Sequence, residues 1–337
     1  MEKALMCPQC NAPLTPHKFA RSIVCAHCGA TIQLDESSVS ASKFHDAFQE
    51  WNASAMHLTD STISLGNRHW ALDQFIAHGD FSDAYAGRLA RFPTELVLIK
   101  ILRDIKDKEP FNNEWHTLQR LQKSNAPGAD TFTQLIPQPV IHGELPTGQQ
   151  VSIFRRASGF QHTFKDVIQA YPNGIAPQAS IWVWRRILEV LSFIHASGMA
   201  HGAVLPEHLL VQENEHGVRL VGYSAAGPLN ENLRSISSEY EFYYPKPAHS
   251  ALALTAQLDL VMSARCMAAI LGGDPQTADL PQTVPTALAG IIQRIAHSDP
   301  ARTASEDAWA IREELGQIAR DVFGPPMFNP IVMPKNS

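Results

Sequence analysis

The sequence has no apolar stretch close to the roughly 20 residues that a membrane-spanning helix needs. It also has no long run of charges of one sign, and its formal net charge is −6. This balance excludes a general electrostatic attraction to anionic membranes or to the phosphates of nucleic acids. Residues 1–7 lack the charged start, apolar centre and cleavage site of a signal peptide. We therefore expect a cytoplasmic protein with no membrane partner.

Cysteine is scarce, and four of the five cysteines form two Cys-x-x-Cys pairs. Cys7 and Cys10 form one pair, and Cys25 and Cys28 form the other. Each pair brings two thiolates to one turn, so both pairs together can supply the four sulfur ligands of a tetrahedral zinc site. Disulfides or a redox pair are the alternative, which a chain without a secretion signal disfavours. The pattern predicts a zinc ribbon over residues 1–34.

This zinc is expected to be structural. Four cysteine ligands leave no open coordination position for catalysis. A stretch of about 30 residues also has too small a core to fold without a metal. The fifth cysteine, Cys266, lies in the apolar run 260–271 and is expected to pack inside a helix.

Residues 35–62 read as a linker that carries an amphipathic helix. The linker begins with a polar stretch, and apolar side chains then recur at helical spacing at Ala41, Phe44, Phe48, Trp51 and Ala55. This apolar face either docks onto the neighbouring domain, which we favour, or binds a partner.

The rest of the chain is long enough for a large core, because the full 337 residues are 45% hydrophobic. Strands are expected around 63–76, 84–89 and 96–102, a helix over 111–121, and a helical part from about residue 180. Residues 321–337 are proline-rich and cannot form a regular helix. This tail either lies along the domain surface or binds a partner.

Seven segments follow one another in a characteristic order. They include a strand, glycine turn and strand around Gly79, a strand that contains Lys100, a helix that contains Glu114, and a loop with the sequence His-Gly-Ala-Val-Leu-Pro-Glu-His. The segments span residues 75–85, 95–102, 111–118, 193–211, 218–224, 258–260 and 299–302.

In this order and spacing the segments resemble those of eukaryotic-type protein kinases. The resemblance covers about residues 66–320 and implies an α+β, bilobal kinase-like fold, with a β-rich small lobe and a helical large lobe. It places the kinase-like domain at residues 63–320. His201, Pro206 and Glu207 match the family's catalytic loop, which reads His-Arg-Asp-Leu-Lys-Pro-Glu-Asn.

The residues that would perform the family's reaction are replaced. Ala203 stands where the family has its catalytic Asp, Leu205 where it has Lys, and His208 where it has the magnesium-binding Asn. Gly222 stands for the Asp of Asp-Phe-Gly, the other magnesium ligand. Because magnesium prefers hard oxygen ligands, the resemblance implies no catalytic residues and no ATP/Mg cofactor. Carboxylates nearby could substitute, although their spacing favours solvent-exposed charges: Glu207, Glu213 and Glu215.

The expected nucleotide site is only partly retained. Of the three family glycines Gly79 persists, while Ala77 and Ser82 replace the others, and Leu98 replaces the small residue that faces adenine. Lys100 and Glu114 match the pair that holds the α- and β-phosphates. They form either a vestigial nucleotide site or a salt bridge between strand and helix, and we favour the salt bridge.

Other matches read as structural frame rather than chemistry. The resemblance assigns His195, His201, Asp259 and Arg302 to the frame of the large lobe. The family's Ala-Pro-Glu, whose Glu usually pairs with such an Arg, is replaced by a segment ending in Lys246. A lysine cannot form that ion pair, so the anchoring of this segment is an open question.

The leading functional hypothesis is a pseudokinase that acts as a protein-binding scaffold or allosteric regulator in a bacterial signalling or stress-response system. The layout is similar to kinase homologues that work with von Willebrand A-type and phosphatase proteins, which are therefore the expected partners. One alternative is a divergent ATP-dependent Ser/Thr kinase or nucleotide transferase with relocated metal ligands. Another is nucleic-acid binding through the ribbon, which the acidic chain disfavours.

Overall fold

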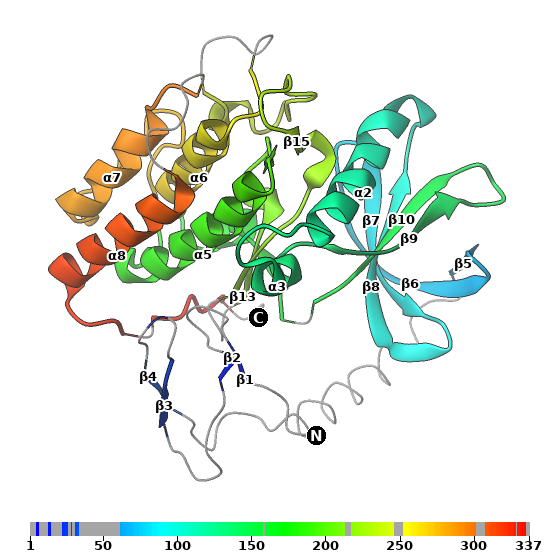
Figure 1. Ribbon diagram of the computed structural model, residues 1–337, viewed down its shortest axis with the longest axis horizontal. Coiled ribbons are helices and arrows are strands. Elements are labelled where there is room, and N and C mark those ends of the chain that lie inside the picture. The colour runs from blue at the N-terminus through cyan, green and yellow to red at the C-terminus, as the bar shows by residue number, and fades with distance from the viewer. Residues whose placement is uncertain are drawn as a thin grey trace. The chain divides into compact units, whose positions relative to one another are not determined.

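The computed structural model describes residues 5–6, 13–14, 22–25, 28, 31–33, 61–157, 159–212, 217–245, 252–300, 307–327 and 329–334. The chain divides into two compact units. The first contains Met1–Gln119 and Pro137–Ala157, and the second contains Arg120–Ile136 and Ser158–Ser337. Figure 1 shows strands gathered in the first unit and helices in the second.

Two short hairpins lie in the N-terminal region. Strands β1 (Leu5–Met6) and β2 (Pro13–Leu14) pair antiparallel, as do β3 (Ser22–Val24) and β4 (Thr31–Gln33). Each hairpin therefore brackets the sequence position of one cysteine pair. The predicted helix with Phe44, Phe48 and Trp51 lies outside the residues that the structure describes.

The first unit is built on a six-stranded antiparallel sheet with the order β5-β6-β7-β8-β10-β9. Its core contains Trp70, Val97, Ile99, Val151 and Ile153, which are fully buried. The strands are β5 (Thr62–Leu65), β6 (Arg68–His78), β7 (Ser82–Leu89), β8 (Phe92–Leu102), β9 (Gln138–Glu144) and β10 (Gln150–Arg155).

The region expected as strand around 63–76 is two strands joined by a tight turn. Gly66 and Asn67 both have positive φ, of 60° and 57°. This is the geometry of a two-residue hairpin whose twist matches that of its strands. The dipeptide Gly-Asn between two apolar stretches is a turn signal that the sequence reasoning missed.

Helix α2 (Lys108–Gln122) follows β8 after a short 3₁₀ turn, η1 (Ile105–Asp107). The helix matches the prediction over 111–121. It buries Phe111, Trp115 and Leu118, which recur at helical spacing. The Trp115 ring stacks on His142 of β9, with the centroids 5.3 Å apart. Apolar packing thus fixes α2 against the sheet in the first unit.

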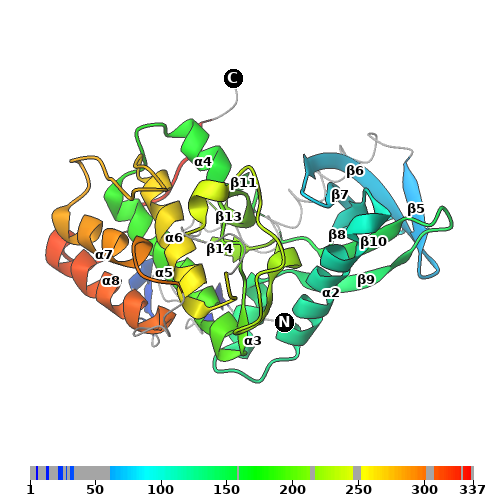
Figure 2. The same cartoon turned by 90° about the horizontal axis from the view of Figure 1, so that it is seen from above.

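The second unit is mainly helical. Its helices are α3 (Ala129–Phe132), α4 (Phe164–Ala170), α5 (Pro177–Ala196), α6 (Ala256–Ile270), α7 (Thr286–Ala296) and α8 (Ala308–Phe323). Short strands accompany them: β11 (His162–Thr163), β12 (Met199–Ala200), β13 (Leu209–Gln212), β14 (Gly217–Leu220) and β15 (Gly227–Pro228). Single 3₁₀ turns are η2 (Thr133–Leu135), η3 (Pro206–His208), η4 (Tyr223–Ala225) and η5 (Glu241–Tyr243). Figure 2 shows these helices from a second direction.

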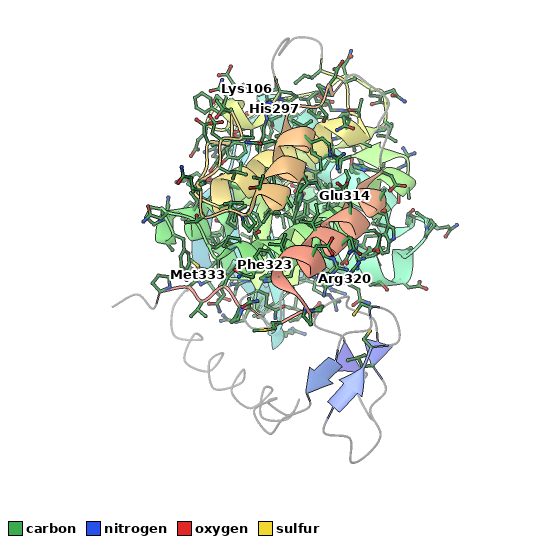
Figure 3. The ribbon with its side chains drawn as sticks, turned by 90° about the vertical axis from the view of Figure 1, so that its left-hand side faces the viewer. Lys106, His297, Glu314, Arg320, Phe323 and Met333 are labelled. Carbon is green, nitrogen blue, oxygen red and sulfur yellow. The ribbon has the colours of Figure 1, made fainter. Side chains whose placement is uncertain are left out.

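Helices α5 and α6 form the centre of this unit. Nearly all of α6 is buried, including Cys266, which confirms the expectation of a packed helical cysteine. A buried charge network joins α5 to α8, because Glu189 accepts hydrogen bonds from Arg186 at 2.9 Å and from Arg312 at 2.7 Å. Glu314 of α8, labelled in Figure 3, pairs with Arg294 of α7.

The proline-rich tail lies along the second unit. The indole N–H of Trp182 donates to the carbonyl of Asn329 at 3.0 Å, and the Tyr171 hydroxyl donates to the carbonyl of Val332. Ile331 is buried. Figure 3 labels Phe323 at the end of α8 and Met333 on the tail. For the described residues of the tail, the structure supports the expectation that the tail lies along the domain surface.

Within the described parts of the chain, no helix combines the length and the apolar character that crossing a membrane requires.

Candidate functional site

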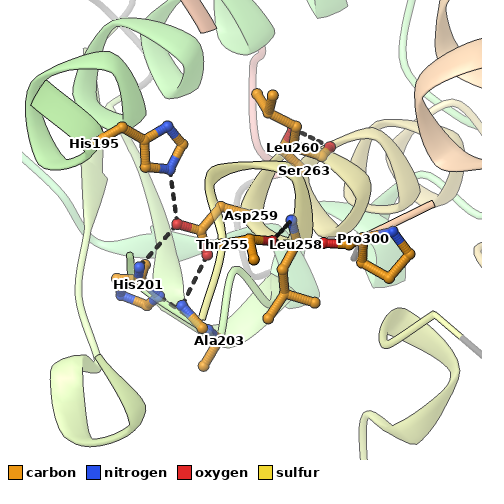
Figure 4. Close-up of polar contacts among 10 residues, drawn as sticks. His195, His201, Ala203, Thr255, Leu258, Asp259, Leu260, Ser263 and Pro300 are labelled. Carbon is orange, nitrogen blue, oxygen red and sulfur yellow. Dashed lines mark hydrogen bonds and ion pairs between the residues drawn. The ribbon is translucent and has the colours of Figure 1, made fainter. Parts of the chain in front are cut away.

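Asp259 of α6 organises the loop that resembles a catalytic loop. Its carboxylate accepts hydrogen bonds from the backbone N–H groups of His201 and Gly202, both at 2.8 Å, and from Nε2 of His195 at 2.9 Å. Asp259 is completely buried, so these three donors replace the water that its charge would otherwise need. Figure 4 shows this arrangement. The expectation that His195 and Asp259 are structural frame is confirmed.

His201 is held as a neutral ring. Its Nδ1 accepts a hydrogen bond from the N–H of Ala203 at 3.2 Å, and its Nε2 lies 3.1 Å from the carbonyl oxygen of Val221. A carbonyl can only accept, so the proton must be on Nε2. Burial lowers the pKa of His201 to about 3. With both nitrogens occupied, His201 positions backbone, as expected for a frame residue.

Two of the positions where the kinase pattern has catalytic groups carry buried apolar side chains. Ala203 and Leu205 are both almost inaccessible to solvent. A methyl group at residue 203 cannot accept a proton, and the Leu205 side chain packs in the interior instead of reaching a phosphate. Both side chains therefore contribute to the packing of the loop.

His208 fills the space beside Gly222. The Nδ1 of His208 donates to the carbonyl of Ala203 at 2.7 Å. Gly222 has φ of 79°, and a Cβ added there would lie 2.4 Å from two atoms of the His208 ring. No side chain fits at residue 222 while the ring is in this position. Of the two positions expected to bind magnesium, one therefore carries the His208 ring, and the other, Gly222, leaves the space that this ring fills.

These residues do not fit a magnesium ion. Magnesium is held in proteins by carboxylate and other hard oxygen ligands in octahedral geometry. Ala203, Gly222 and His208 offer no side-chain oxygen. Of the alternative carboxylates, Glu207 is bound 2.5 Å from Nζ of Lys165, while Glu213 and Glu215 lie outside the described residues.

Gly202, like Gly222, lies against side chains that leave no space for a Cβ. The kinase pattern has an Arg here, whereas Gly202 has φ of 71°. A Cβ at this position would lie 2.5 Å from Leu254 and 2.8 Å from Leu233. Two leucine side chains therefore occupy the space that any side chain at residue 202 would need.

Residues 237–245 are held by two cations that the sequence reasoning missed. Lys165 of α4 lies between the carboxylates of Glu207 and Glu239, and these hydrogen bonds raise its pKa. Arg265 of α6 donates to the carbonyls of Phe242 and Tyr244, at 2.9 and 2.7 Å. These contacts supply an anchor for the segment that ends in Lys246. Arg302 and Lys246 lie outside the described residues.

In the first unit, Lys100 and Glu114 form the expected pair. Nζ of Lys100 lies 2.8 and 2.7 Å from the two carboxylate oxygens of Glu114. The Glu114 residue is only 4% exposed. The pair joins β8 to α2 as an ion pair. This geometry also leaves an ammonium group at the place where the kinase pattern has one.

Hydrogen bonds within the glycine turn and from Arg103 fix its conformation. The N–H of Gly79 donates to the carbonyl of Ser82 at 2.9 Å. Arg103 donates to the carbonyls of Gly79 and Asp80, at 2.5 and 2.8 Å. The N–H of Gly79 is therefore already used within the turn and not directed at a phosphate. Leu98 is half-buried in β8, opposite Ala86 and Phe154 in the adjacent strands.

The described part of the ribbon contains two of the four predicted zinc ligands. Cys25 directly follows β3 and is buried, and Cys28 is partly exposed before β4. Two sulfurs three residues apart at one hairpin suit a zinc site of the Cys₄ type. Cys7 and Cys10 lie outside the described residues.

Comparisons with known proteins agree with this architecture. The model of the PriA DNA helicase Cys-rich region domain, a zinc ribbon family, matches residues 7–32. A comparison with curated protein sequences gave no match.

Solved structures with the same fold include vaccinia related kinase 3, with a TM-score of 0.61 and 14% identity over 85% of this chain and 99% of that one. They also include the BubR1 kinase domain, with a TM-score of 0.57 and 14% identity over 84% of this chain and 94% of that one. At such low identity the likeness shows the fold alone. The chain has the fold of a protein kinase, with a β-rich lobe and a helical lobe, preceded by a zinc ribbon.

Proposed function

We propose that this chain is a pseudokinase: a catalytically inactive kinase homologue that acts as a protein-binding scaffold or allosteric regulator. The observation that carries the proposal is the contact between His208 and Gly222. The His208 ring lies where a side chain at residue 222 would be, with an added Cβ 2.4 Å away. A substitution that merely weakened catalysis would not require a second residue to fill the vacated space.

The proposal follows from how phosphoryl transfer works. That reaction depends on positioning the nucleotide and on magnesium ions that neutralise the developing charge. Ala203 supplies no base, and neither His208 nor Gly222 supplies a hard oxygen ligand. Three separate contributions are therefore missing together, while the frame around Asp259 is retained. A retained frame without this chemistry can still present a rigid binding surface.

The partners that we propose are proteins of the same bacterial signalling or stress-response system, of the von Willebrand A or phosphatase type, in the cytoplasm. Zinc on Cys7, Cys10, Cys25 and Cys28 would hold the ribbon as a second binding element. Co-elution of the full chain with purified proteins of these two types during gel filtration would support this partner class. Separate elution from both would exclude it.

One observation favours a divergent ATP-dependent kinase or nucleotide transferase as the alternative. The Lys100–Glu114 pair is intact, with two short contacts. In an active enzyme such a lysine would bind nucleotide phosphates, and metal ligands would have to come from other residues.

A second alternative is nucleic-acid binding through the ribbon. The matching zinc ribbon model is named for a DNA helicase. Anisotropy of a labelled single-stranded oligonucleotide should show no binding by the full chain below about micromolar concentration at physiological salt. Tighter binding that Cys25→Ser abolishes would favour this alternative over the protein scaffold.

The deciding experiment for the pseudokinase measures phosphate transfer and nucleotide binding on the same protein. We expect no incorporation from radiolabelled ATP with magnesium or manganese. We also expect little thermal stabilisation, because 1 mM ATP with a Kd of 1 mM would add only about 0.4 kcal/mol. Lys100→Ala is the informative variant, and Lys106→Ala, at an exposed lysine, is the matched control. Incorporation that is lost in Lys100→Ala and kept in Lys106→Ala would overturn the proposal.

A further inference from the structure

One end of β6 has an unpaired edge in the described part of the sheet. Strand β5 pairs with β6 only from Leu65↔Arg68 to Thr62↔Ala71, and the carbonyl of Ser61 accepts a last hydrogen bond from Leu72. Beyond this point β6 continues to His78 with β7 on its other side. Residues 73–78 of β6 therefore have one strand neighbour among the described residues.

This end of β6 also exposes large apolar side chains. Phe75 is 42% exposed and Ile76 is 46% exposed. The pairing with β7 shifts register between Phe75 and Ala77, so Ile76 has no directly opposite residue in β7, and the whole strand end from Gln74 to His78 is exposed. The Phe75 ring contacts the Tyr85 ring of β7 edge-on, with centroids 5.5 Å apart. We call Phe75, Ile76 and Tyr85 the β6 patch.

Strand β5 begins beside the part of β6 that leads to this patch. Because β5 and β6 are antiparallel, Ser61 and Thr62 lie at the end of β5 toward which β6 runs from Ala71 to Phe75. Four residues along a strand measure about 13 Å, and neighbouring strands are about 4.8 Å apart. Residues 56–61 can span up to about 20 Å when extended. The segment that ends at Ala55 can therefore reach the β6 patch without moving β5.

We propose that residues 41–55 pack on the β6 patch through Phe44, Phe48 and Trp51. These three residues recur at helical spacing on one face, and residues 44–51 would measure about 11 Å along a helix. Residues 73–78 span about 17 Å of strand, so the three side chains fit within the length of this strand end. The connection is short, and it keeps this segment near the patch at an effective concentration in the millimolar range, above that of a separate partner. The inference is independent of the pseudokinase proposal.

Hydrogen–deuterium exchange of the full chain tests this contact in both directions. Trp51→Ser should speed exchange in residues 73–78 about tenfold, because the edge and patch lose their cover. Phe75→Ser/Ile76→Ser should speed exchange in residues 44–51 to a similar extent. Both effects should be the same at two protein concentrations that differ tenfold, since the contact lies within one chain.

Matched controls separate this contact from general destabilisation. Asp46→Ser changes the opposite side of the predicted helix, and Phe242→Ser removes a phenylalanine that is 54% exposed in the second unit. Neither control should alter exchange in residues 73–78 or 44–51. Unchanged exchange in residues 73–78 of Trp51→Ser would overturn the proposal. So would protection that grows with protein concentration, which would indicate a second copy of the chain.

Discussion

At the scale of single residues, two glycines of the site lie directly against larger side chains that fill the space beside them. The His208 ring and the missing side chain of Gly222 fit each other, and the leucines at 233 and 254 fit the missing side chain of Gly202. In each case a glycine with positive φ lies against a larger neighbour. Each glycine leaves space beside the backbone, and a neighbouring side chain fills that space, so the loops are closely packed.

We expect Gly222→Ala to lower the free energy of unfolding by about 3 kcal/mol. Part of the loss comes from the positive φ, which costs a residue with a Cβ about 1–2 kcal/mol. The rest comes from the collision with the His208 ring. Urea denaturation should therefore show a smaller loss when the same change is made in a His208→Ala background. Equal losses in both backgrounds would mean that the ring and the glycine are not coupled.

The buried ring of His201 should make the protein sensitive to acid. The unfolded-state pKa of a histidine is about 6.5, whereas burial lowers the folded-state pKa of His201 to about 3. As the pH falls below about 6.5, only the unfolded state takes up the proton, so stability decreases by about 1.4 kcal/mol per pH unit until the folded pKa is reached. Asp259 and His208 are the charged or titratable groups that act on the ring.

A comparison with His201→Gln isolates this contribution. Glutamine can still donate to the carbonyl of Val221 but does not titrate. Between pH 7 and pH 5 the original protein should lose about 2 kcal/mol more unfolding free energy than the variant in urea denaturation. Parallel pH profiles would show that His201 titrates similarly in both states.

The residues that sequence reasoning found and those that it missed differ in a physical way. Lys100, Glu114, His195 and Asp259 could be predicted because they occur within recognisable segments. Lys165 and Arg265 could not, since each makes its contacts with residues far away in sequence. A single arginine in the apolar run 260–271 was the available signal for Arg265, because a buried cation in a helix needs a partner.

At the scale of elements, the Lys100–Glu114 pair holds α2 to β8. Lys100→Met would remove the lysine charge from the buried Glu114 carboxylate, which should lower the unfolding free energy by about 3 kcal/mol. Lys100→Met/Glu114→Leu should recover part of this loss, because the buried carboxylate is then absent as well. Lys106→Met, at an exposed pair, should have no measurable effect. A double variant as unstable as Lys100→Met would contradict this interpretation.

The helices also show which of their boundaries can be predicted from the spacing of apolar residues. The helix over 111–121 could be predicted because its apolar residues recur at helical spacing and pack on the sheet. The helical unit begins earlier than expected, with α4 and with Pro177 at the start of α5. Those starts depend on a capping box at Thr163 and on a proline at the first helical position. Such local signals extend a helix beyond its periodic apolar core.

At the scale of the whole molecule, zinc should be required by the ribbon alone. Elemental analysis should give about one zinc per chain, and Cys25→Ser should remove it. Thermal unfolding of the kinase-like part should change little, because its core is formed by other residues. Cys266→Ala is the control, since this buried cysteine lies in α6. Loss of zinc in the control, or retention in Cys25→Ser, would refute the assignment.

The packing around Gly202 limits which residues this position can accept. An arginine at residue 202 would meet Leu254, Leu233 and an unfavourable φ at the same time. Any single substitution at residue 202 would therefore lower the free energy of unfolding, whatever group it brought to the loop. Larger side chains become acceptable there only when Leu233, Leu254 and the local backbone change as well. Position 202 is thus coupled to two distant leucines, and substitutions at the three positions should be non-additive in stability.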